Sequence, residues 1–286
     1  MRSESGDNGL SVGGRGGGHS LIAFSRWMPG DGEQIFTMLA DGGGIRQLTG
    51  DEGQGSNWCP AWSPDATRIC FTSSRNRYSR IYVMSAHGSD QRQLTAGEGG
   101  DDFAPDWSPD GASIVFERGD GGADALYLLE VRSGRQRPLT ASGSLDSAGA
   151  WSPDGTLIAF RRSWTRPAGL YVMRADGGEA RFLTPGNHPR WSPDGGRVAY
   201  SHAGAIWVLP VDGAGRARGE PRQLTSNPQG HDRHPCWSPD GGRLALEREA
   251  LRGCKVEHRI VTMDATGDDI RDLCEGHGPA WSPPLP

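Results

Sequence analysis

Short hydrophobic runs alternate with turn-forming residues along most of the chain. A run of apolar residues such as Ile69–Phe71 is soon followed by a second one such as Ile81–Met84, and this pairing then recurs. Runs of this length, bounded by glycine, proline, asparagine and aspartate, favour β-strands joined by tight turns over long helices. The pattern therefore predicts an all-β fold, and the high content of 44 glycines agrees with it.

The strand pairs belong to a repeat marked by the sequence Trp-Ser-Pro. It occurs at intervals of 45, 44, 40, 46 and 44 residues, at Trp62, Trp107, Trp151, Trp191, Trp237 and Trp281. After Trp-Ser-Pro-Asp come two apolar runs, a turn that is often Asp-Gly, and usually Leu-Thr. Four short strands in roughly 40–45 residues indicate the blades of a β-propeller. In such a blade proline and aspartate favour a turn, glycine adopts a positive φ, and tryptophan fills the space between neighbouring sheets.

The two ends of the chain predict how the ring closes. Residues 20–49 contain a blade that lacks only its Trp-Ser-Pro strand, and Pro279–Pro283 supply that strand at the C-terminus. Joining the two removes open sheet edges, which otherwise favour aggregation. We therefore predict a six-bladed β-propeller over residues 20–286, with four antiparallel strands per blade. Residues 1–19 are rich in glycine, and we expect this segment to be flexible.

These motifs resemble the TolB-like propeller repeat, also called PD40, which is WD40-like. Its core reads W-S-P-D-G-x-x-I-A-F, as in Trp151–Phe160, followed by an I-Y-V-M type of run, a D-G turn and L-T, as in residues 170–184. The resemblance covers residues 20–286 and implies the propeller fold. Similar propellers include the protein-binding half of the periplasmic protein TolB, gates on serine peptidases, and the catalytic body of oligogalacturonate lyases. The resemblance therefore leaves the function open.

Several classes of function are disfavoured by the sequence as it stands. It shows neither the additional N-terminal domain expected of TolB nor the G-x-S-x-G elbow of a hydrolase. Met1–His19 lacks the apolar region of a signal peptide, which predicts a cytoplasmic protein, or a periplasmic or secreted one if a leader had been removed. The net charge of −5 and the lack of a long apolar run argue against nucleic-acid binding and membrane insertion. We expect a monomer.

The loops that enter each Trp-bearing strand are the first place to look for chemistry, because propeller ligands usually bind at the mouth of the central channel. His188 and His234 stand three positions before their tryptophans, and His277 stands four positions before its own. Imidazoles from three successive blades could bind a divalent transition metal. His231 and Asp232 lie beside them and are the candidate catalytic residues. The alternative is that all of these are polar rim residues without chemistry.

Candidate ligand-binding residues come from two sets of loops on the same face. They are Trp58, Asp102 and Asp146 in the entry loops, and Arg75, Arg162, Trp164 and Arg248 between the second and third strands. Arginine and exposed aromatic residues commonly anchor protein partners and anionic ligands. The aspartates could instead pair with the arginines and act only in the fold.

Two hypotheses follow from these candidates. In the first, the propeller is a binding scaffold for a protein or a small polar or anionic ligand at the channel mouth, with no chemistry of its own. In the second, it is a metal-dependent lyase or another small-molecule enzyme that uses the histidines.

Overall fold

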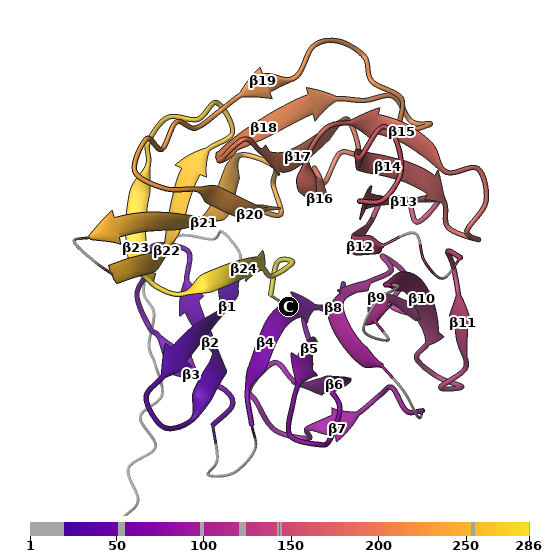
Figure 1. Cartoon of the computed structure of the whole chain (residues 1–286). Helices are drawn as coiled ribbons and strands as arrows, with labels where there is room; N and C mark the ends of the chain where they lie inside the picture. Colours follow the sequence, from indigo (N-terminus) through magenta and orange to yellow (C-terminus); the bar gives the residue numbers. More distant parts are fainter. Residues whose placement is uncertain are drawn as a thin grey trace, which may run out of the picture.

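The protein is a closed ring of six four-stranded β-sheets around a central axis (Figure 1). This computed structural model describes residues 20–50, 55–97, 100–119, 124–141, 143, 145–252 and 255–285. The predicted six-bladed propeller with antiparallel strands in every blade is confirmed. The segment at residues 1–19, which we expected to be flexible, lies outside the described residues.

We number the blades in chain order and give the strands of each from the axis outward. Blade 1 contains β24 (His277–Trp281), β1 (Leu21–Met28), β2 (Gly32–Leu39) and β3 (Arg46–Gln47). Blade 2 contains β4 (Asn57–Trp62), β5 (Arg68–Ser73), β6 (Arg80–Ser85) and β7 (Arg92–Gln93). Blade 3 contains β8 (Asp101–Trp107), β9 (Ser113–Gly119), β10 (Ala125–Glu130) and β11 (Gln136–Pro138).

The remaining blades follow the same order. Blade 4 contains β12 (Asp146–Trp151), β13 (Leu157–Arg162), β14 (Gly169–Arg174) and β15 (Arg181–Thr184). Blade 5 contains β16 (Asn187–Trp191), β17 (Arg197–His202), β18 (Ala205–Pro210) and β19 (Arg222–Gln223). Blade 6 contains β20 (Asp232–Trp237), β21 (Arg243–Arg252), β22 (Lys255–Asp264) and β23 (Arg271–Glu275).

The C-terminal strand closes the ring, as the sequence predicted. β24 pairs with β1, with Trp281 opposite Ile22. Ser282 then donates its N–H to the Leu21 carbonyl (2.7 Å), and its Oγ accepts the Leu21 N–H (2.8 Å). Within blade 2, Ser63 makes the same two bonds to Arg68, five residues away in the chain. The closing contact is therefore the ordinary Trp-Ser-Pro hairpin, made between the two ends of the described chain.

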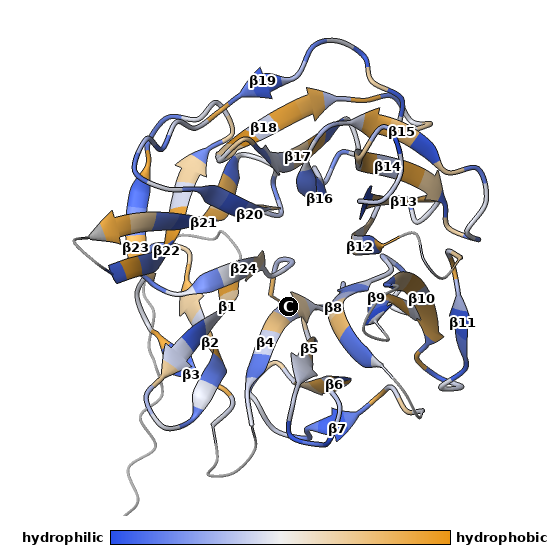
Figure 2. Cartoon of the chain, viewed as in Figure 1, coloured by the Kyte–Doolittle hydropathy of each residue, from blue (hydrophilic) through white to orange (hydrophobic). Residues whose placement is uncertain are grey.

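Each tryptophan of the repeat packs in a hydrophobic cluster between two neighbouring sheets. Between blades 1 and 2, for example, Trp62 packs with Ile35 and Leu48 of one sheet and with Phe71 and Tyr82 of the other. Corresponding clusters contain Trp107, Trp151, Trp191, Trp237 and Trp281. Figure 2 shows the apolar residues concentrated in the middle strands, whereas the outer strands β7 and β19 are hydrophilic. The core is thus divided into six clusters that lie between neighbouring sheets.

The alternating strand direction gives the ring two different faces. One face carries the loops that enter each innermost strand and the turns between the second and third strands, and we call it the entry face. The opposite face carries the Ser-Pro-Asp turns and the turns between the third and outermost strands. Within the described ranges no helix is long and apolar enough to cross a membrane.

Candidate functional site

Every innermost strand has the same irregularity three residues before its tryptophan. The residue there has a positive φ of 46–58°, and the pairing with the second strand shifts register across it. These bulge residues are Cys59, Ala104, Ala148, His188, His234 and Gly278. A side chain at positive φ is uncommon outside glycine, and β-bulges serve to redirect side chains. The offset from tryptophan that singled out His188 and His234 in the sequence is therefore a defined backbone position.

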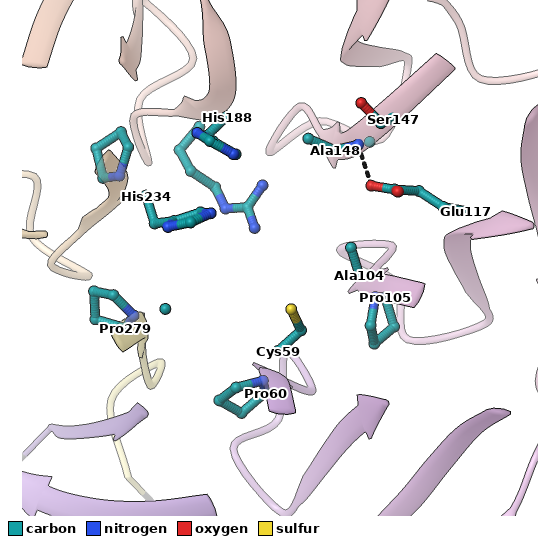
Figure 3. A pocket seen from close by; sticks show the side chains of 14 residues that line it. Cys59, Pro60, Ala104, Pro105, Glu117, Ser147, Ala148, His188, His234 and Pro279 are labelled. Carbon is teal, nitrogen blue, oxygen red and sulfur yellow. Dashed lines mark hydrogen bonds between the residues drawn. The ribbon is translucent and has the colours of Figure 1, made fainter. Parts of the chain in front are cut away.

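The bulge residues of all six blades line one cavity of about 250 Å³, which consequently lies on the ring axis (Figure 3). In most blades the residue after the bulge residue also lines it, and three further side chains complete the wall: Glu117, Ser147 and Arg190. In Figure 3 the side chains of His188, His234, Cys59 and Glu117 approach the same space from different blades. The cavity is thus a single site built by the whole ring, with polar side chains from several blades among small apolar ones.

Glu117, on β9, is the acidic residue of this cavity. Its Oε1 accepts the N–H of Ala148 in the next blade. Burial raises the pKa of Glu117 to about 7, although the hydrogen bond from Ala148 and the charge of Arg190 act in the opposite direction. Around neutral pH this carboxyl group is therefore partly protonated and can donate as well as accept a hydrogen bond.

His188 and His234 form a close pair, with ring centroids 3.9 Å apart and planes tilted by 48°. His188 Nδ1 lies 2.9 Å from Ser201 Oγ, and that hydroxyl donates its own hydrogen to the Asn187 carbonyl at 3.2 Å. With the hydroxyl hydrogen on the Asn187 carbonyl, Nδ1 is the donor and Nε2 of His188 is left as an acceptor. Burial, and after it the neighbouring His234, hold the pKa of His188 well below 6.5. His188 is a neutral imidazole at physiological pH.

Glu247, on β21, binds two histidines of the entry face, His234 and His258. It is 4% exposed, and it accepts hydrogen bonds from His234 Nδ1 at 2.8 Å and from His258 Nδ1 at 2.9 Å. The Gly278 N–H adds a third bond at 3.3 Å. Burial alone would raise the pKa of Glu247, but His234, His277 and His258 together lower it to about 2. The carboxylate stays ionised and fixes the His234 ring at the cavity wall.

The three predicted metal ligands do not surround one point. His188 and His234 share the cavity, whereas His277 Nε2 lies 3.5 Å from Glu33 Oε1 and its ring lies 6.3 Å from that of His258. Across the ranges that the structure describes, no group of three or more His, Cys, Asp or Glu side chains is arranged to hold a metal ion. The structure therefore gives the metal hypothesis no preformed site.

The candidate aspartates and arginines are largely paired with one another. Within blades 3, 4 and 6 an aspartate with no exposed surface binds an arginine on the adjacent strand through two hydrogen bonds of 2.6–2.9 Å: Asp102–Arg118, Asp146–Arg162 and Asp232–Arg248. The Arg162 guanidinium also covers the rings of Phe160 and Tyr171, at 5.1 Å from each centroid. These contacts agree with the alternative given above, in which the aspartates pair with arginines and act in the fold.

The remaining candidates lie on the entry face around the cavity. Arg75 binds Asn57 Oδ1 (3.1 Å) and Gln91 Oε1 (2.8 Å), so it too is held within its blade. Trp58 lines a second pocket with Glu33 and His277, and its ring lies 6.3 Å from that of Phe103. Trp164 is 76% exposed in the β13–β14 turn, and His231 is exposed in the loop before β20.

Two cavity residues, Glu117 and Arg190, and the buried Glu247 were missed in the sequence. Glu117 and Glu247 occupy one equivalent position, directly after the large apolar residue that ends the core of each second strand, as in Phe116-Glu117 and Leu246-Glu247. The corresponding residues in the other blades are Ser25, Thr72, Arg161 and Ser201. Aligning the second strands, as was done for the entry loops, would have identified this position. Arg190 directly precedes Trp191, at a position that we did not compare between repeats.

The fold and this axial site together define a six-bladed β-propeller with an axial cavity formed mainly by its innermost strands. A family model described as the TolB beta propeller domain, PD40, matches residues 89–285. The chain belongs to this family, and the resemblance seen in the repeat is confirmed.

The similarity to solved structures extends over more of this chain than the similarity in sequence to a curated relative. The Tol-Pal system protein TolB of Thioalkalivibrio sulfidiphilus (strain HL-EbGR7) is 30% identical over 86 residues, which are 30% of this chain and 20% of that protein. The match thus spans about a fifth of the curated relative. The crystal structure of TolB from Acinetobacter baumannii is similar with a TM-score of 0.77 and 22% identity, covering 92% of this chain and 67% of that one. An oligogalacturonate lyase from Vibrio parahaemolyticus gives a TM-score of 0.60 and 13% identity, covering 88% and 74%. At these identities the solved structures establish the fold alone.

Proposed function

We propose that this chain is a binding module that docks a protein partner on its entry face, over the axial cavity. The observation that carries the proposal is the cavity itself, because residues from all six blades build it and the entry-face loops surround it. Two large aromatic residues on the same face, Trp27 at 63% and Trp164 at 76% exposure, are suited to anchor a partner.

The catalytic alternative has less support. Asp232, one of the two residues that could act as the base with His231, has no exposed surface and is held by Arg248 through both carboxylate oxygens. A general base must reach the proton that it removes, and this carboxylate would first have to break a buried ion pair. Family membership also favours binding, since a relative carries the name of a Tol-Pal system protein.

Site-specific photo-crosslinking in the native host tests the proposal. A photoreactive phenylalanine analogue replaces Trp164 on the entry face in one variant. In the control it replaces Ile270, which is 48% exposed in the β22–β23 turn on the opposite face. We expect one defined protein adduct from position 164 and none from position 270. Adducts from both positions, or from neither, would contradict docking on the entry face.

The adduct identifies the partner, and purified components then give the energetics. Truncation of an exposed tryptophan that anchors an interface typically costs at least about 2 kcal/mol, or about thirtyfold in Kd. We expect Trp164→Ala to weaken binding by this amount in calorimetry and Ile270→Ala to leave it unchanged.

A further inference from the structure

Arg190 is a cation in the axial cavity that lacks an anionic partner among the described residues. It stands on β16, half-buried, between the bulge residue His188 and Trp191. One hydrogen bond holds it, from Nη1 to the Pro189 carbonyl at 3.0 Å, and no described carboxylate forms an ion pair with it. Three other arginines on the second strands of their blades, Arg118, Arg162 and Arg248, are by contrast each bound by an aspartate. Most of the donors of Arg190 therefore remain available to a ligand.

The positive charge of Arg190 acts on the whole cavity. Burial is the main influence on the pKa of five groups near the guanidinium. The charge of Arg190 lowers the pKa of each of them, which are Cys59, Asp106, Glu117, His188 and Cys236. Two of these neighbours, Cys59 and His188, are neutral at physiological pH, since burial raises the pKa of the Cys59 thiol to about 12 and lowers that of His188. A guanidinium in such surroundings gains most from a single negative charge that can accept two of its N–H groups.

We propose that the axial cavity binds one carboxylate group, held by the Arg190 guanidinium with the Glu117 carboxyl group as a second contact. This inference rests on the proposed docking at the entry face, because the carboxylate would be carried by a side chain or C-terminus of the docked partner. The cavity of about 250 Å³ is smaller than the roughly 300–1,000 Å³ pockets that enclose drug-sized ligands, so it fits one side chain or a small acid. A doubly charged anion such as sulfate would place an uncompensated charge beside one cation in a partly dry site.

Glu117 makes the binding dependent on pH. When protonated it donates a hydrogen bond to the incoming carboxylate, and when ionised it repels it. The groups that face it are the Ala148 amide on β12, Arg190 on β16, Asp124 before β10 and the Cys59 thiol on β4. Since the pKa of Glu117 is about 7, the affinity for a carboxylate should fall about tenfold between pH 6 and pH 8, as its protonated fraction falls.

Titration of the full chain with sodium acetate tests the site without any partner. Ionic strength is held constant with sodium chloride, and the imidazole C–H resonances of His188 and His234 are followed by NMR at pH 6. We expect a saturable shift with acetate and a much weaker response to inorganic sulfate, which carries two negative charges at this pH. Arg190→Met should weaken acetate binding at least tenfold, and Arg190→Lys several-fold because lysine lacks the planar fork. The lysine variant, which keeps the charge, serves if the methionine variant does not fold.

Arg46→Met is the matched control, because Arg46 also donates one hydrogen bond to a backbone carbonyl, His87, but lies on the outer strand β3. It should bind acetate as the unmodified chain does. The proposal is overturned if acetate gives no saturable shift, if Arg190→Met responds like the unmodified chain, or if sulfate binds as tightly as acetate. If acetate does not bind but position 164 gives a defined adduct, the docking proposal remains intact. Acetate binding through Arg190 without that adduct would leave only the small-acid site.

Discussion

Replacing Glu117 by glutamine should stabilise the fold relative to the native chain, by an amount that grows as the pH rises. Glutamine keeps the oxygen that accepts the Ala148 N–H, has the same size, and removes the carboxyl group that can ionise. In the native chain this carboxyl group lies deep within the ring, and its ionised form is disfavoured there because burial removes water from the charge. The substitution therefore tests the electrostatics of the cavity with little change in packing.

The magnitude follows from the two pKa values of this side chain. The value is about 7 in the fold and 4.5 for an unperturbed glutamate, so the folded state binds the proton more tightly. The stability contributed by the protonated form is complete below about pH 4.5 and is lost as the pH rises through 7. At about 1.4 kcal/mol per pKa unit the full effect is about 3 kcal/mol. Screening by water in the cavity reduces it, and we expect about 2 kcal/mol between pH 5 and pH 8.

Differential scanning calorimetry of the native chain, Glu117→Gln and the exposed control Glu220→Gln at pH 5 and pH 8 measures this effect. Other carboxylates and histidines titrate in the same range, but their contributions cancel between variants. The melting temperature of Glu117→Gln, relative to that of the native chain, should rise by about 4–8 °C from pH 5 to pH 8, at about 2–4 °C per kcal/mol. The control should follow the native chain. If Glu117→Gln also follows it, the pKa of Glu117 is not raised and our account of the cavity is wrong.

Two further predictions concern the fold. Deleting residues 276–286 removes β24 and the contacts of Ser282 with Leu21, so we expect aggregation or a fall of more than about 10 °C in melting temperature. Melting within a few degrees of the full chain would contradict the closure. Asp232→Asn leaves Arg248 without its charged partner and should cost about 2–4 kcal/mol in urea unfolding. The exposed Asp176→Asn should leave the urea midpoint nearly unchanged, and an equally small effect at Asp232 would show that the ion pair does not stabilise blade 6.

The ring could be predicted from the sequence because each repeat is one structural unit with its own markers. The tryptophan, the Ser-Pro-Asp turn and the two apolar runs specify a blade locally, and the incomplete first repeat specifies the closure. The bulge positions of His188 and His234 could also be located, because their distance from the tryptophan is fixed by the strand. For such residues the alignment of repeats substitutes for a structure.

The roles of the polar residues depend on partners that the repeat does not encode. His188 binds Ser201 while His234 binds Glu247, although both histidines occupy the same backbone position. His277 stands one residue before the bulge position and meets Glu33, so it does not join the other two at the cavity. Likewise, an aspartate paired across the strand with an arginine looks the same in the sequence as one that awaits a ligand. Only the side-chain contacts distinguish a residue that stabilises a blade from one that is free to bind.

The pairing of β24 with β1 also determines when the ring can be completed during synthesis. Blades 2 to 6 are each made from consecutive residues, whereas blade 1 must wait for a strand translated about 250 residues after its first one, so β1 presents an open edge until that strand has been made. A circular permutant that joins the present ends and begins between β3 and β4 would make every blade from consecutive residues. Its sheets could then form in order as they leave the ribosome, and refolding of the two versions would measure how strongly chain connectivity, at constant structure, limits the folding rate.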